Sequence, residues 1–168
     1  MLPQMDSRPL TQGEIAMARE SFGDGVDYDR VRVRSGAGHN PVAWMAGRNG
    51  NPAITLVNTI HFLEAEPCPD FSCGGNRMLF MHEMTHIWQY DALGAPRFFL
   101  RYGRDFAACG FRAKPMYRYD EGKTRFARAT LEAQAEMVSH YGEALRKHDK
   151  ERLARLKDNL AGTGLYGL

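Results

Sequence analysis

Apolar residues recur at helical spacing in several stretches of this 168-residue chain. Thr11-Gln12-Gly13-Glu14 has the spacing of a capping box and predicts a short helix, which Gly23-Asp24-Gly25 ends. Residues 77–90 contain neither Gly nor Pro and predict a second helix, with apolar positions set among polar ones. Two further helices are predicted near the C-terminus, over residues 124–147 and 150–160.

Alternation with a period of two predicts strands in the first half of the chain. Residues 31–33 alternate valine with arginine, which is typical of a half-exposed strand, and residues 53–62 form the best strand candidate. Residues 36–52 are rich in Gly, Asn and Pro and are expected to be irregular, whereas residues 97–123 are aromatic and basic and are assigned no secondary structure. A small sheet followed by helices indicates an α+β fold, which we expect to form one domain over residues 1–168.

Composition excludes several classes of protein. A formal charge of +2 gives no general electrostatic reason to expect nucleic acid or a membrane surface as the partner. No apolar run is long enough to span a bilayer. Met1–Ser7 lacks the basic-then-apolar pattern of a signal peptide. We therefore expect the protein to stay in the cell that makes it, to leave by another route, or to be a piece of a longer chain.

The three cysteines cannot all pair with one another. Cys68 and Cys73 lie close together in a predicted loop, so one disulfide between them is expected if the protein works in an oxidising compartment. Two free thiols are expected in a reducing cytosol. The sequence leaves both alternatives open.

His82-Glu83-Met84-Thr85-His86 carries the clearest chemistry in the chain. Histidines four residues apart project from one face of a helix, so both imidazoles can reach one tetrahedral Zn²⁺ at about 2.0–2.1 Å. Glu83 is placed to take a proton from the metal-bound water and pass it to the leaving amine. The motif therefore predicts a mononuclear zinc site that hydrolyses peptide bonds.

A catalytic zinc keeps three protein ligands and one open position, so a third ligand must come from elsewhere. A histidine six residues after His86 would complete a metzincin site, but Ala92 stands there. The second long helix carries Glu132, Glu136 and His140, spaced four apart on one face. This spacing alone leaves open which acid reaches the metal.

The combination of His82-Glu83-Met84-Thr85-His86 with Glu132-Ala133-Gln134-Ala135-Glu136 resembles the gluzincin arrangement. By that resemblance Glu132 is the third zinc ligand, and Glu136 is the carboxylate that orients a zinc-bound imidazole. The chain departs from the family at position 136, where Glu replaces the usual Asp and is one methylene longer.

The resemblance extends over most of the chain, in blocks of the right order and spacing. They resemble the metallopeptidase domain of spike (valine-glycine repeat) proteins of bacterial type VI secretion. The blocks are Leu10–Ala16, Phe22–Val33, His82–Gln89, Tyr117–Asp120 and Glu132–Glu136.

This resemblance implies a zincin-like fold with a small β-sheet, an HExxH helix and a second long helix that supplies a Glu ligand. It implies Zn²⁺ as the cofactor, a peptide or protein as the substrate, attachment to a secretion spike, and an immunity protein as a further partner. It also implies an antibacterial effector domain, a toxin that needs no signal peptide and acts in the periplasm of target bacteria. A periplasmic destination would permit a bridge between Cys68 and Cys73.

Two further roles stay open at this point. Tyr119 is the candidate donor to the oxyanion of the tetrahedral intermediate, with His140 as the alternative. The strand at residues 53–62 precedes the metal helix, and it either pairs with extended substrate or lies inside the sheet. The alternatives to a peptidase are a zinc-stabilised binding module without catalysis and an amidase or endopeptidase acting on peptidoglycan.

Overall fold

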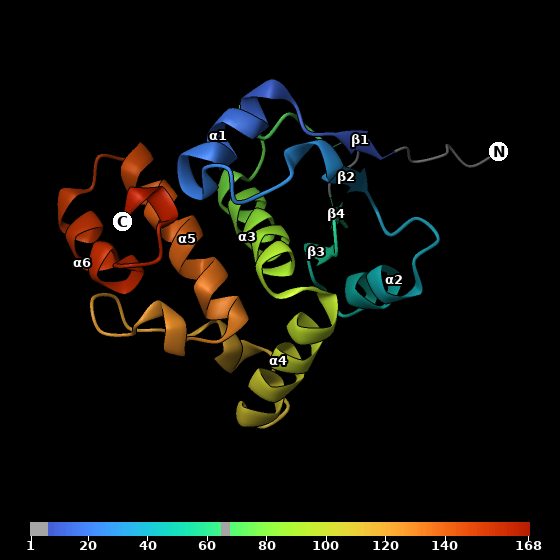
Figure 1. Cartoon of the computed structure of the whole chain (residues 1–168). Helices are drawn as coiled ribbons and strands as arrows, with labels where there is room; N and C mark the ends of the chain where they lie inside the picture. Colours follow the sequence, from blue (N-terminus) through green and yellow to red (C-terminus); the bar gives the residue numbers. More distant parts are fainter. Residues whose placement is uncertain (1–6, 65–67) are drawn as a thin grey trace.

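A four-stranded sheet and six α-helices make up the part of the chain that the computed structural model describes, residues 7–64 and 68–168 (Figure 1). The α+β class predicted from the sequence is confirmed. Residues 1–6, which carry most of the segment without a signal-peptide pattern, lie outside the described residues. Within the described ranges, no helix is long and apolar enough to cross a membrane.

The sheet places one short strand at an open edge beside the helices. Its order is β1-β2-β4-β3, with β2 and β4 parallel and the other two pairs antiparallel. Strand β3 therefore has a partner on one side only. The strands are β1 (Arg8–Pro9), β2 (Arg32–Ser35), β3 (Ala53–Leu56) and β4 (Thr59–Phe62).

The first half of the chain differs from its prediction in two places. The single strand expected over residues 53–62 is a hairpin, because the chain turns at Val57, whose φ is 58°. A β-branched residue rarely adopts this left-handed conformation, and nothing in its residue type announces a turn. Residues 36–52, expected to be irregular, contain helix α2 (Pro41–Arg48), which begins at Asn40 with its side chain accepting two backbone N–H groups.

The helices stack in layers beside the sheet, as Figure 1 shows from right to left. Helix α3 lies against the sheet, α5 packs along α3, and α6 covers the other side of α5. Helix α1 crosses one end of α3, and α4 extends from the other end. The bounds are α1 (Gln12–Phe22), α3 (Arg77–Leu93), α4 (Ala95–Ala108), α5 (Leu131–Arg146) and α6 (Lys150–Leu160).

Local signals set the ends of these helices. The capping box at Thr11 and Glu14 is confirmed, with both reciprocal hydrogen bonds present. Gly94 forms the corner between α3 and α4 at φ 77° and ψ 149°, a conformation open essentially to glycine alone. The second long helix begins later than predicted, because Thr130 caps α5. Residues 126–128 before it form a 3-10 turn instead.

None of the three cysteines is joined in a disulfide in the structure. Cys73 is exposed, and burial raises the pKa of the half-buried Cys68 thiol. The pairing of Cys68 with Cys73 remains a prediction for an oxidising compartment.

Candidate metal centre

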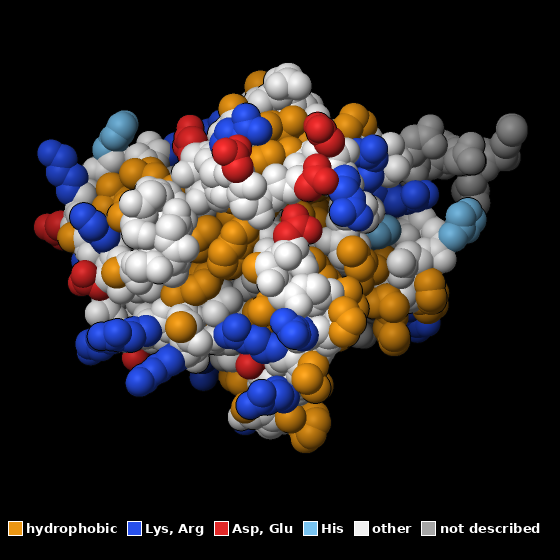
Figure 2. Space-filling model, in the orientation of Figure 1, with side chains coloured by type: hydrophobic (Ala, Val, Ile, Leu, Met, Phe, Trp, Pro, Cys, Tyr) orange, Lys and Arg blue, Asp and Glu red, His pale blue; other side chains and the backbone are white. Residues whose placement is uncertain are grey.

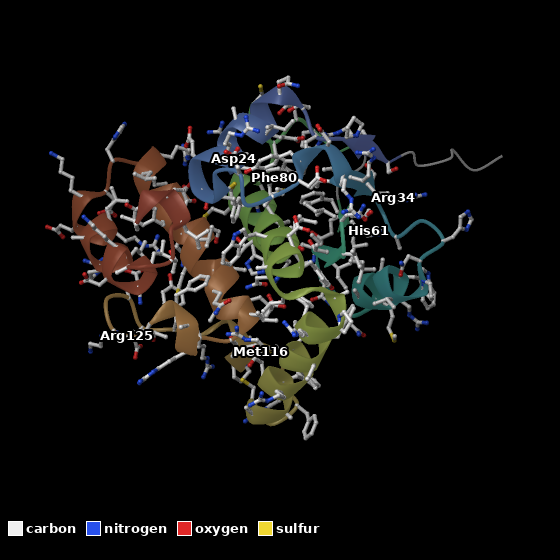
Figure 3. The ribbon with its side chains drawn as sticks, viewed as in Figure 1. Asp24, Arg34, His61, Phe80, Met116 and Arg125 are labelled. Carbon is white, nitrogen blue, oxygen red and sulfur yellow. The ribbon has the colours of Figure 1, made fainter. Side chains whose placement is uncertain are left out.

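Helix α3 carries His82, Glu83 and His86 through the middle of the molecule. Because the sheet covers one side of α3 and α5 the other, the whole segment Phe80–Ile87 is buried. His82 is 5% and His86 6% exposed, so these are not solvated histidines on a surface helix. Figure 3 shows Phe80 on the same helix, near its N-terminal end.

Three ligand atoms converge between α3 and α5. Nε2 of His82 lies 3.2 Å from Nε2 of His86, and Oε2 of Glu132 lies 3.0 Å from the first and 3.2 Å from the second. Glu132 is 5% exposed, and it is the acid that the structure brings to both imidazoles. Among the described residues, only these three form such a group of ligand atoms.

These spacings fit one metal ion. Ligands about 2.0–2.1 Å from a tetrahedral zinc lie about 3.3 Å from one another, close to the three separations given above. Two imidazole nitrogens facing each other at 3.2 Å need a proton or a cation between them. Burial would lower the pKa of His82, but Glu132 and Glu136 outweigh it and raise that pKa to about 10. The cluster thus favours a positive charge at this point, and the histidines and carboxylate can hold a metal.

Gln89 fixes the orientation of His86 from behind. The Gln89 side-chain amide donates to the Leu131 carbonyl and to Oε1 of Gln134, so its own oxygen is an acceptor. That oxygen lies 2.8 Å from Nδ1 of His86. Nδ1 must then carry the proton, and the Nε2 lone pair is left facing the cluster.

A different group stands behind His82. Oε1 of Glu136 lies 3.0 Å from Nδ1 of His82, a charge contact without the alignment of a hydrogen bond, while Oε2 of Glu136 lies 3.1 Å from Nε2 of His140. The extra methylene of Glu, relative to the Asp usual in gluzincins, lets one carboxylate span both rings. Burial would raise the pKa of Glu136, but the two histidines outweigh it and lower that pKa to about 2. Glu136 is therefore ionised at neutral pH.

Tyr119 lies at the far end of this chain of contacts. Its hydroxyl is 2.6 Å from Nδ1 of His140, on the opposite side of Glu136 from the ligand cluster. The structure therefore does not bring the sequence-predicted oxyanion donor to the metal-binding atoms. His140, the alternative, is held between Tyr119 and Glu136 and faces the back of His82.

Glu83 points into the cleft between α3 and the sheet edge. The Thr55 hydroxyl on β3 donates to Oε2 of Glu83 at 2.7 Å and fixes the carboxylate beside the cluster. Sequence reasoning missed Thr55. Its only signal was a polar residue within an apolar strand that precedes the motif.

Two other tyrosines, also missed, lie at the cluster itself. The Tyr102 hydroxyl donates to Oε1 of Glu132 at 3.0 Å, and the Tyr117 ring stacks on His82 with centroids 5.8 Å apart. Burial, followed by the Glu132 carboxylate, raises the pKa of both hydroxyls. Both stay protonated and able to donate. Tyr117 follows Met116, which is fully buried and labelled in Figure 3.

His61 stands apart from the site. It lies on β4 with Nδ1 3.2 Å from the Gly36 carbonyl, and Figure 3 shows it within the sheet beside Arg34. Burial lowers its pKa, so it is a neutral histidine held by one backbone group.

The cluster opens into a cleft of two halves. One half, of about 230 Å³, is lined by β3, α3 and α4 and contains Glu83, His86 and Glu132. The other, of about 490 Å³, lies towards the N-terminal end of α3 and contains His82, Glu83 and Glu136. Glu83 and Tyr117 line both halves and mark the boundary between them.

With this geometry the chain can be placed among known proteins. It belongs to the eCIS core domain family, whose profile matches residues 9–94, just over half of the chain. The match includes His82, Glu83 and His86 and ends before Glu132.

Two individual proteins are also similar to this chain, one by sequence and one by structure. The chain is 36% identical over 88 residues, or 50% of its length, to the type VI secretion system spike protein VgrG2b of Pseudomonas aeruginosa strain PAO1. The match spans only 8% of that spike protein's length. The solved effector domain of Pseudomonas aeruginosa VgrG2b has the same fold, with a TM-score of 0.67 and 27% identity. That similarity covers 96% of this chain and 88% of the solved domain.

Proposed function

We propose that this chain is a zinc-dependent metallopeptidase with a zincin-like fold, acting as the effector domain of a type VI secretion spike protein. The observation that carries the proposal is the convergence of His82, His86 and Glu132 beside the Glu83 carboxylate. Two imidazoles and one carboxylate form the donor set of catalytic zinc sites in peptidases. Structural zinc sites use four protein ligands and need no adjacent acid.

The residues around the cluster have separate tasks in this reaction. Zinc bound by the three ligands would supply Lewis acidity and make a water molecule acidic near neutral pH. Glu83, held by Thr55, accepts the proton of the attacking water and donates it to the leaving amine nitrogen. Tyr102 holds Glu132 through its second oxygen and so orients the ligand.

Tyr117 replaces Tyr119 as the proposed donor to the developing oxyanion. The Tyr102 hydroxyl is committed to Glu132, and that of Tyr119 faces His140. The Tyr117 hydroxyl also lies close enough to Glu132 for that carboxylate to raise its pKa, but Tyr117 lines both halves of the cleft and retains its proton. A phenol there can donate to a carbonyl oxygen as negative charge develops on it.

The secretion route rests on the two VgrG2b relatives and the eCIS core family. We propose that the domain is carried on a secretion spike, reaches the periplasm of target bacteria, and is toxic there through hydrolysis. An immunity protein in the producing cell would protect it from its own enzyme.

Two substitutions test the enzyme. Glu83→Ala removes the base and no ligand, so zinc content and melting temperature should hold while hydrolysis of a denatured protein mixture falls by orders of magnitude. Glu132→Ala should instead weaken zinc binding, because it removes a ligand and leaves Tyr102 without an acceptor. Glu151→Ala, at an exposed position on α6, is the control and should behave as the parent.

Periplasmic expression separates catalysis from binding. Both Glu83→Ala and Glu132→Ala should be harmless to the host if toxicity is enzymatic. If zinc-loaded Glu83→Ala kills as well as the parent, the enzyme proposal is wrong, and the zinc supports a surface that acts by binding.

A further inference from the structure

The two halves of the cleft differ in chemistry. The smaller half has an aromatic floor, where Tyr90 and Phe98 are buried and stack with ring centroids 3.8 Å apart. Its rim is formed by Val42 of α2 and Phe99 of α4, which are 48% and 53% exposed. Large apolar side chains left exposed at the mouth of a pocket mark a place that an apolar ligand covers.

Charge points the same way. The ionisable side chains that line this half, apart from its tyrosines, are the carboxylates of Glu83 and Glu132 and the imidazole of His86, and no Lys or Arg lines it among the described residues. An acidic side chain entering here would lose its hydration against aromatic walls and would face the Glu83 carboxylate. The larger half, by contrast, includes Lys114.

Apolar exposure also concentrates around this mouth. Most of the exposed large hydrophobic residues in the described chain lie on α2, the β3–β4 turn and α4, the elements next to this half. Figure 2 shows hydrophobic side chains gathered over α2 and along α4. They are Val42, Trp44, Met45, Val57, Phe99 and Leu100.

The open edge of β3 gives the direction of a bound chain. β3 runs from Ala53, which lines both halves, to Leu56, which lines the aromatic half alone. Antiparallel pairing is slightly more stable than parallel pairing, so a chain added to this edge would run opposite to β3. The substrate residues that precede the peptide bond beside Glu83 would then lie in the aromatic half.

We infer that the aromatic half is a specificity subsite, which takes a large apolar side chain immediately before the peptide bond that is cut. The inference rests on the proposed peptidase function and names its substrate class: polypeptides with Phe, Leu, Met or Tyr at that position. Peptidoglycan stem peptides, with carboxylates near their cross-links, are not substrates of this subsite.

Blocked peptides of Gly, Ser, Ala and Thr with one central variable residue test the inference. With zinc-loaded protein, a central Phe or Leu should raise kcat/KM about tenfold or more over Ala, and mass spectrometry should locate the cut directly after that residue. A central Glu should be slower than Ala, and purified peptidoglycan should not be cleaved. Cleavage that ignores the central residue, or an apolar preference only after the cut bond, overturns the inference.

Substitutions at the rim tie the preference to the subsite. Phe99→Ser should lower kcat/KM for the Phe peptide about tenfold with little change for the Ala peptide. Phe99→Lys should raise the rate for the Glu peptide. Phe111→Ser is the matched control, since Phe111 is 72% exposed and does not line the cleft. Zinc contents of all variants should match the parent, and melting temperatures should change little, because Phe99 loses only edge contacts with Tyr90 and Phe98 and is more than half exposed.

Binding distinguishes failure of the subsite from failure of the enzyme. If no peptide is cut although zinc is bound, the proposed function is wrong. Fluorescence anisotropy of the labelled Phe and Glu peptides with zinc-loaded Glu83→Ala protein then decides the subsite. Tighter binding of the Phe peptide, weakened by an added Phe99→Ser, supports an apolar subsite without catalysis. Equal binding of the two peptides overturns it.

Discussion

The two imidazoles of the cluster meet at one point, yet their outer nitrogens are supported in different ways. Nδ1 of His86 is hydrogen-bonded to the neutral side-chain amide of Gln89. Gln89 is 2% exposed, and its amide nitrogen donates to two buried acceptors. Nδ1 of His82 lies near a carboxylate, Glu136, whose side chain is 27% exposed. The partner of His86 is therefore buried and uncharged, whereas the partner of His82 is charged and reached by water.

Burial determines what each support contributes. Water cannot replace a lost partner in the Gln89 network, so every hydrogen bond there must be made within the protein. Water can solvate Glu136 and the half-buried His140, so loss of one member can be partly compensated. We therefore expect Gln89 to stabilise both the fold and the orientation of His86, whereas Glu136 and His140 affect the metal-binding residues alone.

Loss of either histidine should have the largest effect. The parent should bind about one zinc per chain, and zinc at 100 times its dissociation constant should stabilise the fold by about 2.7 kcal/mol. His82→Ala and His86→Ala should each abolish this stabilisation, because each removes one of three protein ligands. Metal analysis and melting curves with and without a chelator measure it. If a variant with both His82→Ala and His86→Ala still binds one zinc per chain, these histidines are not the metal ligands and the comparison of their supports has no basis.

Gln89 substitutions should separate support of the metal from support of the fold. Gln89→Leu should weaken zinc binding about 10–100-fold and lower stability, because Leu131, Gln134 and His86 all lose a partner. Gln89→Glu keeps an acceptor for His86 but loses both donors, so stability should fall while zinc affinity is better retained. Zinc titration and chemical unfolding measure the two effects. Equal behaviour of both variants would refute the distinction.

Changes at Glu136 should affect the metal more than the fold. Glu136→Gln keeps the shape but loses the charge that His82 and His140 face, so zinc affinity should fall by up to about tenfold. The free energy of unfolding should change less than in Gln89→Leu, because water reaches this side. A larger loss of stability at Glu136 than at Gln89 would reverse the comparison.

The parts of the site that the sequence predicted are those set by local geometry. His82, Glu83 and His86 share one helix, and Glu132 and Glu136 share another, so spacing within each helix placed them on usable faces. The α+β class and the helix over Lys150–Leu160 followed from periodicity in the same way.

What the sequence could not predict depends on contacts between distant segments. Thr55 reaches Glu83 only because β3 is a sheet edge beside α3. The hairpin turn that separates β3 from β4 has a single turn-forming residue, Asn58, after a Val57 that predicts strand. Tyr102 and Tyr117 come from the basic, aromatic stretch over residues 97–123, in which helix α4 is not predicted. The packing of α4 and of the 3-10 turn Lys114–Tyr117 against α5 decides which tyrosines lie at the ligand cluster, and Tyr119, two residues after Tyr117, lies on the other side of Glu136.

The smallest effects on zinc binding should come from His140 and Tyr119, which lie behind Glu136 as seen from His82. His140→Phe removes the ring nitrogen beside Glu136 and leaves a carboxylate that water can solvate, so zinc affinity should change by less than about threefold.

Tyr119→Phe removes only the hydroxyl on His140 and should change zinc affinity and hydrolysis by less than about twofold. Tyr117→Phe is its matched partner and should lower kcat about 100-fold at unchanged zinc content, because it removes the proposed oxyanion donor. Steady-state kinetics with zinc-loaded proteins compares the two. A large loss of kcat in Tyr119→Phe with little loss in Tyr117→Phe would return the oxyanion role to Tyr119. It would also mean that the His82 support reaches the reacting atoms rather than ending behind the ligand.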